Sequence, residues 1–595
     1  MEGTGKRLVV VAVLIVLAVA AGLLHLFRYR LFMAAALMIN YARSSVAPPG
    51  SLTLEAAPVT PDVGFEVPVA TAEVPMPPDT ALDWPSYNRT LTSARYSPLD
   101  QVNRDNVGRL KVLCTYDTGE TGRFTTGPIV VKDAIVGTTD DDIFSIDAAT
   151  CRQRWRTHEH YSHVAGNGNR GAAYLDGRLY RGSPDGRVLA YDFKSGTRLW
   201  QTRIANPELN ESAPAAPIAW NGLVFMGNAG GDIKGVKGRI YALDATTGKI
   251  VWEFYLVPKQ PGDPTRGPQA PSPLDTSTWA NQADTPITGG ATWTSYTLDP
   301  ARAELYVPSG NPGPDFATGP RQGANLYSGS VVVLDAKTGA YKRHFKLLSE
   351  DWHDWDVSNT PILIETRTSK HLLSVAPKDG YLYGFDLDSN ALRYRTPVTR
   401  IENADATFST DKAVHFCPGS GGGAEWNSPA FDPQTNLIVT GEVDWCTTVT
   451  LQSDAGIRAV PLGQMWPGMA TSNPYNILGV MDSYRHWAGW VYATDADTGT
   501  WKWRSKSNYP ILSGMTPTAG GVVFFGDMGG NFYALEAATG RRLWGKNLGG
   551  AIGGGVVTYS AGGTQRVAVA AGYTSVLWPT RPATGKIVIL GLPGT

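Results

Sequence analysis

Residues 242–252 read ALDATTGKIVW, and variants of this eleven-residue stretch recur along the chain. The consensus is Ala-x-Asp-Ala-x-Thr-Gly-x-x-x-Trp. Copies that keep the tryptophan also begin at residues 145, 190, 493 and 534, and copies that lack it begin at residues 333 and 384. The pattern predicts a strand ending in aspartate, a tight turn closed by glycine, and a returning strand that buries tryptophan.

The number and spacing of the copies predict an all-β fold. Many neighbouring copies lie about 45 to 60 residues apart, which is typical of four-stranded sheets repeated around an axis. Runs such as GPIVVKDAIVGTT, from residue 127, precede many copies and predict an inner hairpin for each sheet. Seven copies, plus the gap between residues 395 and 485, predict an eight-bladed β-propeller over residues 81–595. After residue 45 no long stretch has helical periodicity.

The N-terminal residues have the features of a targeting segment. Residues 8–27 carry no formal charge and follow Lys6 and Arg7. Twenty such residues in a helix would span a hydrocarbon core of about 30 Å. Residues 1–42 are therefore expected to be a transmembrane anchor or, because residues 18–20 read AVA, a cleaved signal peptide. Residues 43–80, rich in proline, are expected to be a linker.

Composition excludes several classes of function. The net charge is −1, so no basic excess would attract nucleic acid. The four cysteines form neither a CxxC nor a CxxCH motif, which argues against a zinc ribbon and a covalently attached haem. Export would permit disulfide bonds.

A second unusual stretch is DWHDWD at residues 351–356. On a strand, residues i and i+2 share a face, so Asp354 and Asp356 would converge while Trp355 faces away. Two neighbouring carboxylates require a cation, a shared proton or solvent. Taken alone, the stretch is also typical of a solvated acidic turn.

Over residues 82–578 the repeat resembles the PQQ-dependent (quinoprotein) alcohol and sugar dehydrogenases, in which tryptophan-docking motifs hold an eight-bladed propeller. The resemblance implies a periplasm-facing or periplasmic enzyme at the bacterial inner membrane. It would oxidise an alcohol, polyol or sugar and pass electrons to a separate cytochrome c or a membrane quinone. Non-catalytic propeller scaffolds that bind envelope proteins share the repeat and are the alternative.

The resemblance assigns a catalytic base and a metal site. DWHDWDV places Asp354 as the base, and Asp356 at the position of an extra carboxylate in lanthanide-using relatives. Asp232 in GNAGGDIKG and Asn311 in SGNPGPDF match metal ligands. The implied metal ligands are therefore Asp232, Asn311, Asp354 and Asp356, and the implied ion is Ca²⁺ or, alternatively, a lanthanide.

Five further residues match positions around the quinone cofactor, PQQ. Arg170 in NRG would contact its oxygens or carboxylates, and Trp293 would form a floor under its ring. Lys378 in APKDG would hydrogen-bond its carbonyls. Trp426 matches a cofactor-proximal tryptophan, and Glu425 stands where the family has an amide.

The cysteines match the family pattern in one disulfide and depart from it in another. The resemblance implies a Cys417–Cys446 disulfide and leaves Cys114 to pair with Cys151. The family's adjacent-cysteine disulfide, expected near residues 164–165, has no counterpart in the sequence, so the chain is identified as an atypical member. Thr125 and Ala291 also replace a glutamate and a threonine of the family pattern.

Overall fold

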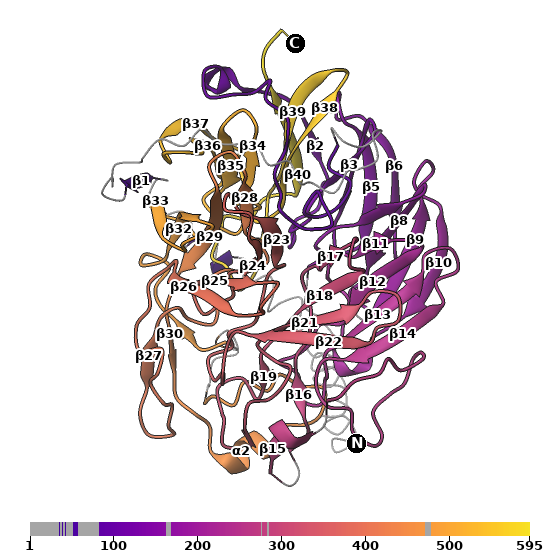
Figure 1. The fold of residues 1–595 in the computed structure, drawn as a ribbon, viewed down its shortest axis with the longest axis vertical. Helices are drawn as coiled ribbons and strands as arrows, with labels where there is room; N and C mark the ends of the chain where they lie inside the picture. Colours follow the sequence, from indigo (N-terminus) through magenta and orange to yellow (C-terminus); the bar gives the residue numbers. More distant parts are fainter. Residues whose placement is uncertain are drawn as a thin grey trace, which may run out of the picture.

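Eight antiparallel sheets follow one another along the chain and make up most of the molecule (Figure 1). The computed structural model describes residues 35, 38–39, 42, 51–56, 83–161, 168–274, 276–282, 285–470, 476 and 478–594. In these ranges, seven of the sheets have four strands and one has five. We call them blades 1 to 8. The fold is all-β and propeller-like, as predicted.

The strands of each blade follow chain order from a buried first strand to a partly exposed last strand, apart from two N-terminal strands, β1 and β2. Blades 1 to 4 are β3 (Ile129–Val131), β4 (Ala134–Thr138), β5 (Asp142–Asp147), β6 (Gln153–His158); β7 (Ala173–Leu175), β8 (Arg178–Gly182), β9 (Arg187–Asp192), β10 (Arg198–Arg203); β11 (Ile218–Trp220), β12 (Leu223–Gly227), β13 (Arg239–Asp244), β14 (Ile250–Tyr255); and β17 (Thr297–Asp299), β18 (Glu304–Ser309), β21 (Ser330–Asp335), β22 (Tyr341–Lys346).

Blades 5 to 8 follow the same scheme. They are β23 (Ile362–Glu365), β24 (His371–Val375), β25 (Tyr381–Asp386), β26 (Leu392–Pro397); β28 (Ala430–Asp432), β29 (Leu437–Asp444), β32 (Ala488–Asp495), β33 (Trp501–Ser507), β1 (Leu52–Ala56); β34 (Thr516–Thr518), β35 (Val522–Gly526), β36 (Asn531–Glu536), β37 (Arg542–Asn547); and β38 (Val556–Ala561), β39 (Thr564–Ala571), β40 (Lys586–Gly591), β2 (Lys111–Asp117).

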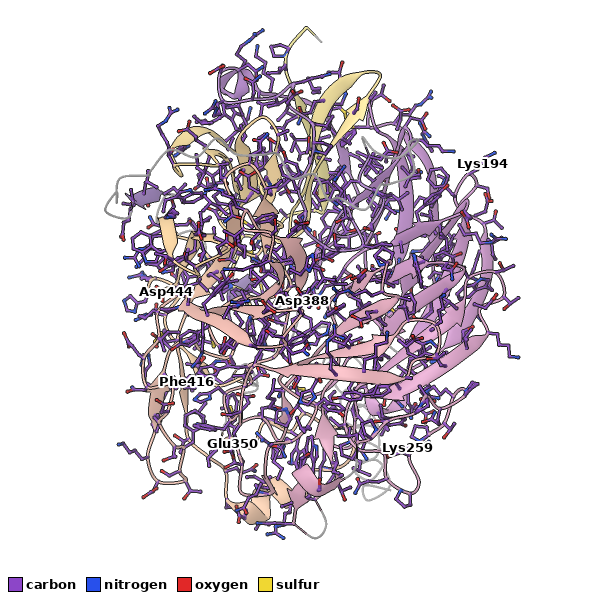
Figure 2. All side chains as sticks on the ribbon, in the orientation of Figure 1. Lys194, Lys259, Glu350, Asp388, Phe416 and Asp444 are labelled. Carbon is purple, nitrogen blue, oxygen red and sulfur yellow. A yellow bond between two sulfur atoms is a disulfide. The ribbon has the colours of Figure 1, made fainter. Side chains whose placement is uncertain are left out.

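Short elements decorate the blades. They are the pairs β15 (Ala280–Asn281) with β20 (Arg321–Gln322) and β16 (Thr288–Gly289) with β19 (Pro312–Gly313), the sheet of β27 (Val414–Phe416), β30 (Thr447–Val449) and β31 (Val480–Met481), helix α2 (Asp454–Ala459), and the 3-10 turns Val107–Arg109, Pro207–Leu209 and Thr276–Thr278. Charged side chains such as Lys194 and Lys259 lie at the periphery (Figure 2).

Buried apolar side chains join every blade to the next. Separate clusters connect the successive pairs from blades 1 and 2 to blades 7 and 8. A further cluster joins blade 8 to blade 1, through Tyr559 and Ile587 on one side and Phe144 and Ile146 on the other. Because the last blade contacts the first, the ring is closed.

The predicted number of blades agrees with the eight observed sheets, but the predicted position of the eighth was wrong. Residues 395–485 hold β28 and β29 of blade 6 and the β27–β30–β31 sheet, rather than a separate blade. Blade 8 consists of the last three strands and β2, which pairs with β40. It escaped detection because its outer strand comes from the N-terminal part of the chain and no repeat turn precedes it.

The repeat builds the contact between neighbouring blades. Its aspartate accepts hydrogen bonds from the turn, as Asp244 does from Thr247 N–H at 2.7 Å. The tryptophan of one blade donates to a carbonyl of the next, as Trp200 Nε1 does to Ala245 O at 3.1 Å. Gly248 has φ +74°, and a Cβ there would lie 2.6 Å from the Trp200 ring. The glycine is therefore needed for both its backbone conformation and the space it leaves.

At two of the three contacts that lack the tryptophan, the glycine of the next turn is replaced as well; at the third, Tyr394 of blade 5 packs on Gly499 of blade 6. Arg343 stands at the tryptophan position of blade 4, and the turn of blade 5 has Asn390 at the glycine position, with φ +58°. At the ring closure, Cys114 stands at the tryptophan position of blade 8, next to the strand bulge. It forms a disulfide with Cys151, which occupies the glycine position of blade 1. At the contact between blade 8 and blade 1, a disulfide bond thus replaces the packing of a tryptophan side chain on a glycine.

Two sequence expectations concern the N-terminal region. Residues 8–27, the predicted anchor, lie outside the described residues. In the part of the chain that the structure describes, we find no helix long and apolar enough to cross a membrane. Within the predicted linker, Leu52–Ala56 form β1, which pairs with β33 at the outer edge of blade 6; apart from Ser51, the rest of the linker is not among the described residues.

Strand direction gives the ring two distinct ends. The repeat turns connect the third and fourth strands of blades 1 to 7, and we call this side the turn end. Because neighbouring strands are antiparallel, loops that precede a first strand, and loops between second and third strands, lie at the opposite side, the site end.

Candidate active site

A cavity of about 810 Å³ opens at the site end. All nine residues predicted from the sequence line it, namely Arg170, Asp232, Trp293, Asn311, Asp354, Asp356, Lys378, Glu425 and Trp426. They come from five blades and are up to 256 residues apart (426 minus 170). The fold therefore brings the whole predicted set to one place.

The loops at the site end supply these residues in a regular way. Asp232, Asn311 and Lys378 lie between the second and third strands of blades 3, 4 and 5. The other six precede the first strands of blades 2, 4, 5 and 6. A segment that follows the Cys446 disulfide holds the Asp232 loop: Trp466 N–H donates to Asp232 O at 2.7 Å. The blades thus hold the loops at the site end in place, and these loops position the side chains that line the cavity.

The acidic stretch at residues 351–356 is not a strand. Asp354 has φ +64°, a left-handed conformation that is unusual for aspartate. Asp351 stabilises the turn by accepting hydrogen bonds from the N–H groups of His353 at 3.0 Å and Trp355 at 3.2 Å. Asp354 and Asp356 still converge, because their carboxylates lie 3.4 and 2.9 Å from Lys378 Nζ. The predicted convergence is correct, but strand alternation is not its cause.

The aromatic residues of this stretch point away from the carboxylates. His353 stacks on Trp355 with ring centroids 3.9 Å apart, within a cluster that includes Phe416. Burial lowers the pKa of His353 to about 3, so the ring is neutral. His353 therefore packs in the core beside the site.

Asn311 and Asp356 are held together by the backbone. Asn311 N–H donates to Asp356 Oδ1 at 3.0 Å, and Asn311 Nδ2 donates to Asp315 Oδ1 at 2.9 Å. Position 310, directly before Asn311, has to be glycine, because a Cβ there would lie 2.4 Å from Asp356 Oδ1. Sequence reasoning missed Asp315. Its signal was an acidic residue four positions after Asn311 in an otherwise uncharged segment, SGNPGPDF.

The electrostatics of the site are those of crowded, buried carboxylates. Burial and the charge of Asp356 raise the pKa of Asp232 to about 6. Burial also raises the pKa of Asp354 well above its usual value, against the influence of Lys378. Burial lowers the pKa of Lys378, but the charges of Asp354 and Asp356 outweigh this effect. The net pKa of Lys378 lies well above its usual value, so Lys378 stays charged. Burial raises the pKa of Glu425 to about 7. Such a cluster favours a bound cation.

Aromatic rings and cations form the other part of the cavity. The Arg170 guanidinium lies 4.8 Å from the centroid of Trp293 and 4.4 Å from that of Trp426. Lys378 Nζ lies 5.8 Å from the Trp293 ring. Trp426 is fixed by its Nε1–H, which donates to Gly553 O at 2.6 Å. Flat aromatic faces next to fixed positive charge suit a planar anionic ligand.

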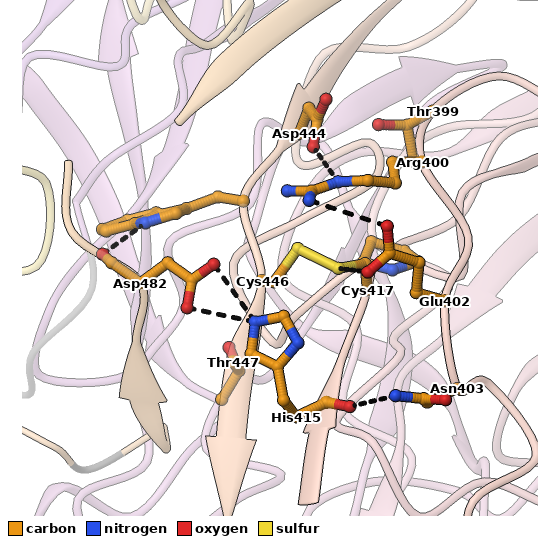
Figure 3. The surroundings of a disulfide bond; sticks show 12 residues. Thr399, Arg400, Glu402, Asn403, His415, Cys417, Asp444, Cys446, Thr447 and Asp482 are labelled. Atoms are coloured by element: carbon orange, nitrogen blue, oxygen red, sulfur yellow. Dashed lines mark hydrogen bonds and ion pairs between the residues drawn. A yellow bond between two sulfur atoms is a disulfide. The ribbon is translucent and has the colours of Figure 1, made fainter. Parts of the chain in front are cut away.

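The outer wall of the cavity contains residues that sequence reasoning did not assign. Trp445, Trp578 and Met481 line it, and the two tryptophan rings lie 5.5 Å apart. Cys417 and Cys446 form a disulfide (Figure 3), which confirms the predicted pairing, and Cys446 directly follows Trp445 of this wall.

The same wall carries an acidic residue with a histidine partner. His415 Nε2 lies 3.1 Å from both carboxylate oxygens of Asp482, which also lines the cavity (Figure 3). Trp445 Nε1–H donates to Asp482 O at 2.8 Å. The disulfide and these contacts fix the wall next to the site.

The departures from the family pattern also fall at the cavity. Thr125 and Ala291 line it, and Thr125 Oγ1–H donates to Asn169 O at 3.0 Å. Residues 164–165 lie outside the described residues. All four cysteines are committed to the two disulfides, so none remains for an adjacent-cysteine pair.

Comparisons with known proteins agree with this geometry. A family model described as "Glucose/ethanol/alcohol dehydrogenase, beta-propeller domain" matches residues 84–389, and one described as "Outer membrane protein assembly factor BamB" matches residues 488–588. The dehydrogenase subunit of alcohol dehydrogenase (quinone) from Komagataeibacter europaeus is 31% identical over 553 residues, covering 83% of this chain and 72% of the relative.

Solved structures give the same result. A quinohemoprotein alcohol dehydrogenase of Pseudomonas putida superposes with a TM-score of 0.77 and 27% identity, covering 87% of this chain and 81% of the other. The quinohemoprotein alcohol dehydrogenase of Comamonas testosteroni gives 0.75 and 25%, covering 86% and 81%. The chain therefore belongs to the PQQ-dependent alcohol dehydrogenase family of oxidoreductases.

Proposed function

We propose that this chain is a quinoprotein dehydrogenase that oxidises the CH–OH group of an alcohol, polyol or sugar in the cavity at the site end. The observation that carries the proposal is the convergence of nine motif-matched residues on one cavity. The alternative, a non-catalytic scaffold, gives no reason for buried carboxylates, a buried lysine and aromatic faces to meet there.

The donor set fits a hard cation. Carboxylate oxygens and an amide oxygen are the ligands that Ca²⁺ and lanthanide ions prefer, and Asp232, Asn311, Asp354 and Asp356 supply them. The Oδ1 atom of Asp354 is buried and has no hydrogen-bond partner. A bound cation would satisfy it and, as a Lewis acid, would polarise an oxygen that approaches the site.

The remaining residues fit PQQ. Trp293 would support its planar ring, and Arg170 and Lys378 would attract its negatively charged groups. Glu425 and Trp426 would border it. When bound, PQQ supplies an electrophilic carbonyl that accepts two electrons and a hydrogen from the alcohol carbon.

Asp354 would act as the general base. As the carboxylate, it would accept the hydroxyl proton of the alcohol while the C–H bond breaks. Lys378, 3.4 Å away, favours the charged form of Asp354 and so prepares it for this step. Asp351 and the backbone of the 351–356 turn would hold the carboxylate in place.

We propose a cellular setting from the sequence and the family. The apolar residues 8–27 support export, and two disulfides are typical of exported proteins. We place the propeller in the bacterial periplasm, anchored to the inner membrane by its N-terminal segment or released if that segment is cleaved. Electrons would pass to a separate cytochrome c or to a membrane quinone, since the sequence has no CxxCH haem motif.

The proposal is tested by reconstituting the purified chain with PQQ and Ca²⁺, and separately with PQQ and a light lanthanide. Reduction of an artificial dye is then followed with simple alcohols, polyols and sugars. We expect alcohol-dependent dye reduction with at least one metal and none without PQQ. Absence of activity with every metal and substrate class, together with stable recovery of envelope protein partners, would favour the scaffold alternative.

A further inference from the structure

Asp315 is a buried carboxylate beside the proposed metal ligands, and no motif assigned it a role. One carboxylate oxygen each from Asp232, Asp315 and Asp354 lie within 4.8 Å of one another. Calcium binds oxygens at about 2.3–2.6 Å, so oxygens on opposite sides of one such ion are roughly 5 Å apart. The three carboxylates are therefore close enough to bind a single ion.

Two of these oxygens lack any partner. Asp315 is 0% exposed and Asp354 is 1% exposed. Neither Oδ2 of Asp315 nor Oδ1 of Asp354 has a hydrogen-bond partner. Burying an anionic oxygen without a partner is costly, and it is tolerated where a ligand completes the site. This observation is independent of the clustering itself.

A neighbouring arginine contacts the backbone of Asp315 and not its free carboxylate oxygen. Arg321 is fully buried, and its Nη2 donates to the backbone carbonyls of Asp315 at 3.1 Å and Asp351 at 2.7 Å. Its Nε donates to Pro314 O at 2.9 Å. Arg321 thus holds the backbone on which Asp315 sits and leaves the Oδ2 atom without a hydrogen bond.

The other oxygen of Asp315 has a separate task. Its Oδ1 accepts a hydrogen bond from Asn311 Nδ2 at 2.9 Å, which fixes the orientation of that amide. One carboxylate oxygen therefore positions a proposed ligand, and the second remains for an ion.

We infer that Asp315 is a fifth side-chain ligand of the metal ion and that it makes the site prefer a trivalent over a divalent cation. This inference rests on the proposed function, because it concerns the metal of that same site. Four carboxylates, Asp232, Asp315, Asp354 and Asp356, then face the ion. Two cations lie at this cluster, Lys378, which pairs with Asp354 and Asp356, and Arg321, which contacts the Asp315 backbone, so the four carboxylates outnumber them. The excess negative charge attracts a triply charged ion more strongly than a doubly charged one.

The test is direct metal binding to the full chain. The protein is stripped of metal and titrated with Tb³⁺, whose luminescence is excited through nearby tryptophans, and Ca²⁺ is measured by competition. Asp315→Asn keeps an oxygen that can accept the hydrogen bond from Asn311 but removes the charge. We expect the Tb³⁺ affinity to fall by at least about 10-fold, and the Ca²⁺ affinity to fall by a smaller factor.

A matched control separates ligation from the loss of any buried carboxylate. Asp527 is 0% exposed and lies in blade 7, where it accepts a hydrogen bond from Tyr533 Oη at 3.0 Å. Asp527→Asn is expected to lower stability and leave the Tb³⁺ affinity of the folded protein unchanged. Equal Tb³⁺ affinity in wild type and Asp315→Asn would overturn the inference.

A second measurement covers the case in which Asp315→Asn does not fold. The wild-type chain is crystallised with Tb³⁺, and the ion is located by its anomalous scattering. An Asp315 oxygen within about 2.6 Å of the ion supports the inference, and an ion bound without Asp315 overturns it. A wild-type chain that binds neither Tb³⁺ nor Ca²⁺ would overturn the proposed metal site as a whole, whereas loss of the Asp315 contact alone leaves that site standing.

Discussion

The turn end and the site end of the ring use the same kinds of residue for opposite purposes. At the turn end, aspartates such as Asp147 have partners for both oxygens: Oδ1 accepts from the N–H and hydroxyl groups of its own turn, and Oδ2 accepts from Arg154. At the site end, Asp354 and Asp315 keep oxygens without partners. Local hydrogen bonds therefore complete the first set, whereas the second set is incomplete without a ligand.

Tryptophan shows the same contrast. At the turn end, Trp252 is 2% exposed, and its Nε1–H donates to Ala336 O of the next blade. At the site end, Trp293 presents its ring to Arg170 and to the cavity. In these residues, the turn end combines burial with satisfied polar groups, whereas the site end combines buried oxygens that lack partners with the left-handed backbone of Asp354.

The largest expected effect is on catalysis. Asp354→Asn should reduce turnover by about 100- to 10,000-fold, because the general base is lost. The melting temperature should change little. Turnover of the reconstituted variant measures this, and turnover close to that of wild type would remove Asp354 from the role of base.

A substitution at the turn end should lower stability and leave metal binding unchanged. Trp252→Ala is expected to lower the free energy of unfolding by about 3–5 kcal/mol, because a large buried ring is removed. Tb³⁺ affinity of the folded variant should equal that of wild type. Denaturant unfolding and Tb³⁺ titration check both expectations, and a change in affinity would show that the two ends are coupled.

The disulfide at the ring closure should act on stability alone. Replacing both Cys114 and Cys151 with serine opens a loop of 37 residues. Loop-closure entropy then predicts a loss of roughly 3–4 kcal/mol in unfolding free energy. The matched double variant of Cys417 and Cys446, next to the cavity, should also alter ligand binding. Equal binding profiles for the two variants would contradict this contrast.

The pairing of ring and glycine at the turn end can be broken with a single residue. Gly248→Asn places a side chain against Trp200 and should lower unfolding free energy by about 1–3 kcal/mol. Asn390→Gly changes the equivalent position in the turn of blade 5. It should not raise the unfolding free energy by a comparable amount, because Arg343 stands at the tryptophan position of blade 4 and no tryptophan ring packs on this turn. Denaturant midpoints of the two variants make the comparison.

The smallest effect concerns pH. The pKa of Asp232 is raised to about 6, so protons compete with the metal as pH falls below that value. Protonation of Asp232 should lower the Tb³⁺ affinity by up to about tenfold per pH unit below pH 6. Asp232→Asn should lose this part of the dependence. A wild-type affinity that does not change between pH 5 and 7 would contradict the prediction.

The sequence predicted the blades because each repeat carries its own turn chemistry. It misplaced the eighth blade because β2 comes from the N-terminal part of the chain and bonds to blade 1 through cysteine instead of tryptophan. Local patterns cannot reveal a contact formed by the two ends of a chain.

The residues of the site could be predicted only where they belong to a recognisable sequence motif. Asp354 and Asp356 were placed together for the wrong reason, since a left-handed residue, not a strand, turns the chain. Asp315 was missed because its role depends on Arg321 and Asn311, whose contacts exist only in the folded protein.

We propose that the cavity at the site end holds PQQ and one metal ion together. The most direct measurement is native mass spectrometry of the full chain after incubation with PQQ and Ca²⁺ or a lanthanide. We expect one PQQ and one metal ion per chain in the wild type, with loss of the metal in Asp232→Ala combined with Asn311→Ala. A wild-type chain that retains neither PQQ nor metal, although folded, would contradict it.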